Sequence, residues 1–202
     1  MNHLIKGAAL ICFAALAAPA HAITVGLNNG TVVDGSNTAT FSQSGISGTI
    51  TAGCDYPTGA ASGCGTAPTI QANANGLGVV SAGDQNNQLD NRGNAEFLTF
   101  SFNANVSLFS ITLVSFAPNS GDRFDLYING TAAVLSGTNT MFAAPYEEVS
   151  TLTIVATNDG TPNGNFRLAG FDVLPSVPVP AGGTLLASGL FGAFAFGRRR
   201  RA

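Results

Sequence analysis

Hydrophobic and polar residues alternate in the middle of the chain. In the segment 97–102, Phe100 and Phe102 fall on one face of an extended backbone, and Thr99 and Ser101 fall on the other. Because side chains of a strand point to opposite faces in turn, this pattern predicts a half-buried β-strand. Segments 106–108 and 111–113 follow with a change of phase, which predicts a turn or bulge near Ser110.

A second clean alternation covers residues 122–128. Asn129-Gly130 follows it directly, and this pair favours a two-residue hairpin turn. The strands are expected about ten residues apart, with Gly, Asn, Asp and Pro between them, which favours an antiparallel sandwich. We therefore predict an all-β domain with a jelly-roll-like β-sandwich. Further strands are expected at 23–27, 38–41, 46–51, 134–135, 151–157 and 166–173.

The N-terminus has the three parts of a secretory signal peptide. Lys6 precedes an apolar stretch over 8–18, Pro19 ends it, and Ala20 and Ala22 supply the small side chains that signal peptidase requires. We predict a signal helix with cleavage after Ala22. A buried N-terminal helix of a cytosolic protein is the alternative, but it would need polar residues on its outer face.

The C-terminus combines a proline motif, an apolar span and a basic cluster. The 17 residues from Ala181 to Gly197 carry no charge, and as a helix they would cover about 25 Å, slightly less than the hydrocarbon core of about 30 Å. We predict a transmembrane helix whose basic end stays in the cytoplasm. The motif is Val177, Pro178, Val179, Pro180 and Ala181, and the topology anchor is Arg198, Arg199, Arg200 and Arg201.

These residues resemble the tails of PEP-CTERM proteins, in particular the VPLPA-CTERM variant, with Val179 in place of the usual leucine. The resemblance covers about the last 26 residues. It implies that an exosortase removes or exchanges the tail, and that the host, a double-membrane bacterium, makes exopolysaccharide and a biofilm matrix. The expected organisation is a signal peptide at 1–22, an extracytoplasmic domain at 23–176 and a sorting signal at 177–202. A plain C-terminal anchor that is never processed is the alternative.

Removing both ends changes the charge of the chain. The segment 23–176 keeps three arginines and no lysine against all eleven acidic residues, a formal charge of −8. With no basic patch to neutralise phosphates, we expect no binding of nucleic acid. The acidic surface suits a protein among hydrated polymers and divalent cations, and ordinary extracellular solubility, the simpler explanation, accounts for the same composition.

Two cysteines remain after the signal peptide. Cys54 and Cys64 lie ten residues apart in a turn-rich stretch, and in an oxidising compartment such a pair predicts one disulfide. A metal site would need more ligands, but both histidines, His3 and His21, are lost with the signal peptide.

A glycine-rich turn at 75–80 and an acidic turn at 89–98 are similar to segments of middle domains attached to such tails. Asp90 and Glu96, with nearby asparagine oxygens, would supply hard ligands to Ca²⁺. The alternative is that Asp90 caps a turn and Glu96 pairs with Arg92 on the surface. No other cofactor is expected.

Three functions remain after these arguments. The first is a non-catalytic structural or adhesive role at the cell surface or in the matrix, with exposure to the inner membrane only while the tail is attached. The second is a carbohydrate-binding module, with Tyr127, predicted to point outward, as the binding residue; the alternative for Tyr127 is a rim residue of the sheet.

The third function is a carboxylate-dependent enzyme acting on glycans. Without histidine or lysine in the segment 23–176, the serine and cysteine nucleophile arrangements are excluded. Only a carboxylate pair remains. Glu147 and Glu148 are adjacent and on a regular strand would face opposite sides. We therefore predict that the protein is not an enzyme.

Overall fold

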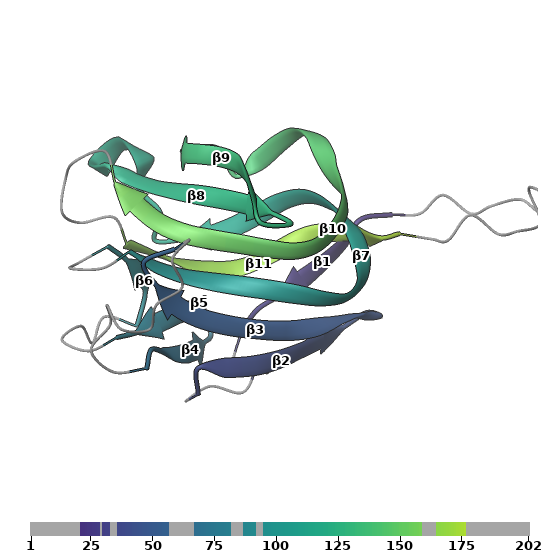
Figure 1. Ribbon diagram of the computed structural model, residues 1–202, viewed down its shortest axis with the longest axis horizontal. Coiled ribbons are helices and arrows are strands. Elements are labelled where there is room, and N and C mark those ends of the chain that lie inside the picture. The colour runs from purple at the N-terminus through teal and green to yellow at the C-terminus, as the bar shows by residue number, and fades with distance from the viewer. Residues whose placement is uncertain are drawn as a thin grey trace, which may run out of the picture.

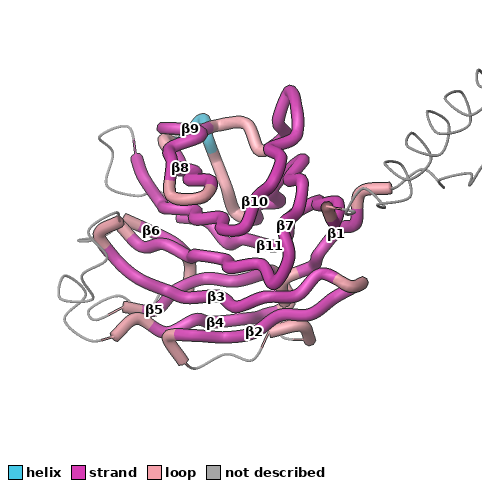
Figure 2. Tube along the Cα trace, turned by 45° about the vertical axis from the view of Figure 1, so that its right-hand side comes forward, coloured by secondary structure: helices cyan, strands magenta, loops and turns pink. Residues whose placement is uncertain are grey.

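The computed structural model describes residues 21–28, 30–32, 36–56, 67–81, 87–91, 95–158 and 165–176. This part of the chain is mostly antiparallel β-sheet, as the alternation predicts, with a short 3₁₀ turn at Pro118–Ser120 (Figure 2). The predicted signal helix and transmembrane helix lie outside the described residues, apart from His21 and Ala22. In the part that is described, no helix has the length and hydropathy needed to cross a bilayer.

The strands follow the predicted segments closely at several places. Asp122–Ile128 forms one strand from end to end, and Asn129 and Gly130, with φ of 51° and 77°, form the predicted hairpin turn. The strands are β1 (Ile23–Gly26), β2 (Thr38–Gln43), β3 (Ile46–Cys54), β4 (Thr69–Asn73), β5 (Gly76–Val80), β6 (Leu89–Asp90), β7 (Glu96–Val114), β8 (Asp122–Ile128), β9 (Thr131–Gly137), β10 (Met141–Asn158) and β11 (Asn165–Pro175).

One hydrogen-bonded sheet connects all the strands. Its main path runs β4-β5-β11-β7-β10-β8-β9, while β1 and β6 pair with β11, and β2 pairs with β3, which pairs with β7. The 19-residue β7 takes part in two regions: residues 96–102 pair with β3, and residues 106–114 pair with β11. The sheet therefore bends along β7 and β10 and folds over on itself (Figure 1).

The predicted irregularity near Ser110 is a β-bulge. Ser110 pairs with Asp172 and Leu108 pairs with Val173, so Phe109 is one extra residue in β7. A bulge bends its strand and increases the local twist. Residues 103–105, which lie between the predicted segments 97–102 and 106–108, belong to the same strand and are exposed.

The sequence predicts a glycine-rich turn at 75–80, but most of this segment is a strand. Gly76–Val80 is strand β5, in which Leu77 and Val79 are buried. The two glycines, Gly76 and Gly78, leave room for neighbouring backbone, because an added Cβ would lie 2.6 Å from the Leu168 carbonyl oxygen and 2.1 Å from that of Asn87, respectively. Close approach of another backbone is a common reason for glycine within a strand.

Aromatic side chains join the two facing parts of the sheet. Phe171 of β11 is fully buried, and its ring centroid lies 5.9 Å from that of Phe41, 5.4 Å from Phe100 and 5.5 Å from Phe102. Phe41 belongs to β2, and the other two belong to β7. Such edge-to-face pairs contribute beyond the area that they bury. The core therefore lies between β11 on one side and β2 with the first part of β7, residues 96–102, on the other.

The two ends of the domain are neighbours. β1 and β11 are antiparallel, and Ile23 pairs with Val173. The nitrogen of Ser176, the last described residue, still donates a hydrogen bond to the Asn105 carbonyl oxygen over 3.0 Å. The chain therefore enters the sheet and leaves it at the same end.

Candidate functional site

An aromatic cluster lies on the outer face of the sheet. Tyr127 of β8 and Tyr56, which follows β3, have ring centroids 4.4 Å apart, and Tyr56 also contacts Phe97 of β7 at 5.3 Å. Phe97 is buried but does not belong to the main core. Because Leu98 and Phe100 point into the core, Phe97 and Thr99 point outward. Tyr127 thus lies on the face that the sequence predicts for it.

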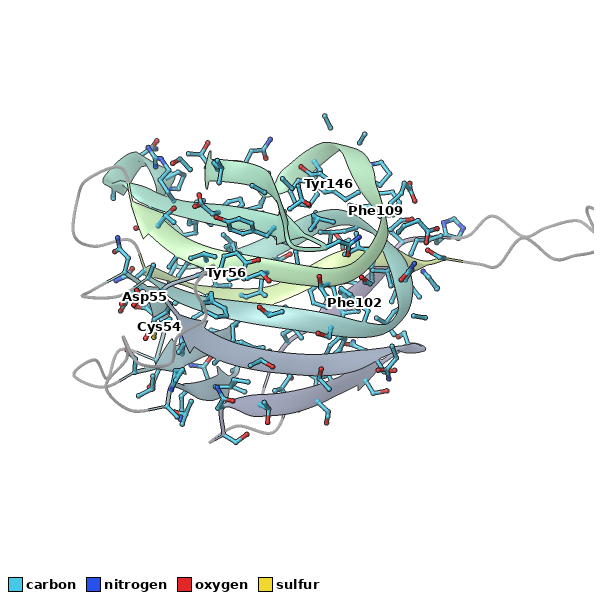
Figure 3. All side chains as sticks on the ribbon, in the orientation of Figure 1. Cys54, Asp55, Tyr56, Phe102, Phe109 and Tyr146 are labelled. Carbon is cyan, nitrogen blue, oxygen red and sulfur yellow. The ribbon has the colours of Figure 1, made fainter. Side chains whose placement is uncertain are left out.

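The cluster lies away from the end at which the chain leaves the sheet. Figure 3 shows Cys54, Asp55 and Tyr56 together at one end of the domain, and β11 runs toward the opposite end, where it finishes at Pro175. The register agrees, because Cys54 pairs with Glu96, at the start of β7. Tyr56 was not predicted as a site residue, and its position two residues after the cysteine that ends β3 is the signal that places it.

Burial raises the pKa of Tyr127 above its ordinary value of 10.0, and Asp125 and Tyr56 add to the effect by electrostatic repulsion. The phenol therefore stays protonated at neutral pH, when it both donates and accepts a hydrogen bond. Asp125 lies two residues earlier on β8, and its Oδ1 accepts a hydrogen bond from the Ser136 nitrogen over 2.7 Å. The cluster thus combines aromatic rings, a neutral phenol and a carboxylate.

The structure brings the two predicted calcium ligands together. Asp90 and Glu96 are both 1% exposed, and the Asp90 nitrogen lies 3.2 Å from Oε2 of Glu96, to which it donates a hydrogen bond. The alternative, in which Glu96 lies on the surface, is therefore wrong, because this side chain is buried at the start of β7. Arg92 lies outside the described residues. Within those residues, no group of three His, Cys, Asp or Glu side chains is arranged to hold a metal ion.

Cys54 is buried and disulfide-bonded. Cys64 lies outside the described residues, so its pairing with Cys54 stays a prediction. A disulfide at this point fixes the end of β3 beside Tyr56. The covalent link therefore supports the position of the aromatic cluster.

The adjacent carboxylates of β10 do not diverge as on a regular strand. Glu148 has a φ of 53° at an irregular part of β10. Glu147 accepts a hydrogen bond from the Ser107 hydroxyl, and Oε2 of Glu148 accepts one from Asn105 Nδ2 over 2.7 Å. Both carboxylates are therefore directed to β7, and the prediction of opposite sides is wrong because a bulge interrupts the alternation.

A pocket of about 540 Å³ lies elsewhere, between β9 and the start of β10. Its lining includes Phe142 and Tyr146, whose ring centroids are 5.0 Å apart, and Met141, which is 72% exposed. None of the site residues predicted from the sequence lines it. The aromatic cluster and this pocket are therefore separate features of the surface.

The sorting motif, the apolar span, the basic cluster and Ala20 all lie outside the described residues. Ala22 is the described residue that directly precedes β1.

Known proteins add nothing to this geometry. Comparisons of the chain with protein-family models, with curated proteins and with solved structures find no match.

Proposed function

We propose that the protein is an exported, non-catalytic component of the cell surface or extracellular matrix, sorted by an exosortase and associated with exopolysaccharide. The observation that carries the proposal is the order of features in the tail: Val177–Ala181, then the uncharged 182–197, then Arg198–Arg201. The span and its basic end hold the precursor in the inner membrane with the domain outside. Signal peptidase acts at one end and the exosortase at the other.

The boundaries of the sheet support this arrangement. β1 begins at Ile23, directly after the proposed cleavage site, and β11 ends at Pro175, just before the motif. Because β1 and β11 are paired, both processing sites would lie at one end of the domain. Within this proposal, the folded-over sheet is a jelly-roll-like β-sandwich, preceded by a signal helix and followed by a transmembrane helix.

Mass spectrometry of the protein from its native cell tests the sorting step. We expect an N-terminus at Ile23 and a C-terminus that lacks Arg198–Arg201. Replacement of both motif prolines, Pro178→Ala and Pro180→Ala, should leave the tail intact, because an extended backbone no longer holds the motif for the enzyme. Pro175→Ala, three residues before Pro178 and outside the motif, is the matched control and should be processed normally. A cell-associated mature form that keeps the arginines would contradict the proposal.

A second candidate is a carbohydrate-binding module, which the contact between Tyr56 and Tyr127 favours. Aromatic rings with a polar group are common platforms for sugars, because the ring packs against C–H groups while the phenol forms hydrogen bonds. The position of the cluster, away from the end bearing the tail, leaves it directed toward the outside while the precursor is anchored.

Tyr127→Ala should weaken binding to the host's exopolysaccharide about fivefold or more, since an aromatic contact is worth roughly 1 kcal/mol beyond its buried area. Affinity electrophoresis in gels that contain the polysaccharide measures this change. Tyr146→Ala, which removes a tyrosine paired with Phe142 instead, is the control and should bind normally. Unchanged binding by Tyr127→Ala would remove this residue from the site.

A further inference from the structure

Hydroxyl side chains form a regular row across four neighbouring strands of the outer face. One threonine on each of β2, β3, β7 and β10 pairs directly with the threonine of the neighbouring strand. The next residue in line, on β8, is Tyr127, which pairs with Thr153. The first row is Thr38, Thr51, Thr99 and Thr153.

A second row runs parallel to the first, two residues along each strand. Because alternate residues of a strand share a face, both rows project to the same side of the sheet. Each strand thus contributes a Thr-x-Thr or Thr-x-Ser segment. The second row is Thr40, Thr49, Ser101 and Thr151, and the two rows together are called the threonine face below.

The edge of the threonine face is open to solvent. Thr38, Thr40, Thr49 and Thr51 are exposed, and nearer the centre Thr99 Oγ1 lies 2.9 Å from Thr153 Oγ1, within hydrogen-bond distance. Among the described residues, the hydroxyls of Thr40, Thr49 and Thr51 form no hydrogen bond with protein groups. Each is available as both donor and acceptor.

The face is also hollowed at one side. Thr40 and Thr49 line a pocket of about 450 Å³, together with Ser42, Ser47 and Asn103. This lining continues the hydroxyl pattern by one more residue pair along β2 and β3, since Ser42 pairs with Ser47. The Asn103 amide donates a hydrogen bond to the Ser47 hydroxyl over 2.9 Å. Every polar side chain in this hollow is uncharged.

The regular repeat and the absence of charge define the partner. Neighbouring strands are about 4.8 Å apart and alternate residues about 6.7 Å apart, so the hydroxyls repeat at the scale of a sugar unit. A periodic surface suits a periodic ligand. An anionic polymer would find no positive charge on this face. The domain as a whole would also repel it, because residues 23–176 carry three arginines against eleven acidic residues, a formal charge of −8.

The twist of the sheet indicates whether the ligand is a single polysaccharide chain or the flat surface of a crystal. Neighbouring strands rotate by roughly 20–25° relative to one another, so four strands cannot present a flat lattice. A planar crystalline surface would contact only part of the threonine face. A single flexible chain can follow its curvature.

We propose that the threonine face binds a single neutral polysaccharide chain, which crosses the strands from the hollow at Thr40 and Thr49 toward Tyr127 and Tyr56. This inference rests on the carbohydrate-binding candidate above and names its ligand and its path. The exposed hydroxyls of β2 and β3 replace water around the sugar hydroxyls. Nearer Tyr127, where Thr153 is only 4% exposed, the aromatic cluster supplies a stacking contact at the end of the first row.

The triple substitution Thr40→Val, Thr49→Val and Thr51→Val tests the proposal. Valine keeps the branched shape and strand preference of threonine but removes the hydroxyl, so the fold should be retained. The matched control is Thr112→Val, at an exposed position of β7 that pairs with Gly170, away from the threonine face. The exported protein is run in native gels containing hydroxyethyl cellulose, dextran or alginate, and is sedimented with microcrystalline cellulose.

We expect at least one of the two neutral soluble glycans to retard the wild type, and the triple variant to bind it at least about tenfold more weakly. Thr112→Val should match the wild type. If Tyr127→Ala loses binding but the triple variant keeps it, the threonine face is overturned while the carbohydrate-binding candidate stands. Binding to neither soluble neutral glycan, binding to alginate or crystalline cellulose alone, or self-association abolished by the triple substitution would also overturn the proposal.

Discussion

Phe171→Ala is expected to lower the free energy of unfolding by about 3–5 kcal/mol, the range for removal of a buried phenylalanine ring. The ring is fully buried and contacts phenylalanines of both β2 and β7. Its removal therefore leaves a cavity between the two facing parts of the sheet. Because the total stability of a domain is about 5–15 kcal/mol, this loss is a large part of it. Urea denaturation followed by circular dichroism measures the change.

Two further variants make this expectation specific. Leu135→Ala truncates a side chain that is 63% exposed, and it should change stability by no more than about 0.5 kcal/mol. Phe171→Leu keeps most of the apolar volume, so it should fold and lose about 1–1.5 kcal/mol even if the alanine variant does not fold. A loss below about 1 kcal/mol in Phe171→Ala would show that this ring does not join the two parts of the sheet.

Gly78→Ala is expected to destabilise the domain by about 2–3 kcal/mol, as for overpacking of a tight interior site. The added Cβ would lie 2.1 Å from the carbonyl oxygen of Asn87 and 2.8 Å from the Cα of Gln88. These are backbone atoms that cannot rotate away. The adjacent hydrogen bond from the Val79 nitrogen to the Gln88 carbonyl oxygen, 3.2 Å long, holds this contact in place.

The matched control is Gly26→Ala in β1. There the nearest atom to the added Cβ is Gln43 Oε1, at 3.8 Å, an ordinary contact. Because alanine also reduces the entropy of the unfolded chain, Gly26→Ala should be neutral or stabilising by a few tenths of a kcal/mol. Equal urea midpoints for the two variants would show that the backbone approach at Gly78 is not tight.

The local alternation of hydrophobic and polar residues was sufficient to predict many of the strands. The segment 122–128 and the Asn129-Gly130 turn are predicted residue by residue, because alternation and a positive-φ pair are both local properties. The bulge near Ser110 is visible as a change of phase. By contrast, the two-residue β6 and the first ten residues of β10 carry weak alternation, so only pairing with distant strands makes them part of the sheet. β4 was also missed, although it alternates regularly and pairs with the next strand, β5.

The site shows the same division. The sequence predicted export and sorting motifs at the two ends, and it determined that the domain between them is acidic and all-β and that Tyr127 points outward. Each of these depends on composition or on neighbours along the chain. Only the tertiary structure decided that Tyr56 lies against Tyr127, that Asp90 and Glu96 are buried, and that four Thr-x-Thr/Ser segments stand in register. Register is set by pairing between residues about 50 positions apart in the chain, and no local pattern contains that information.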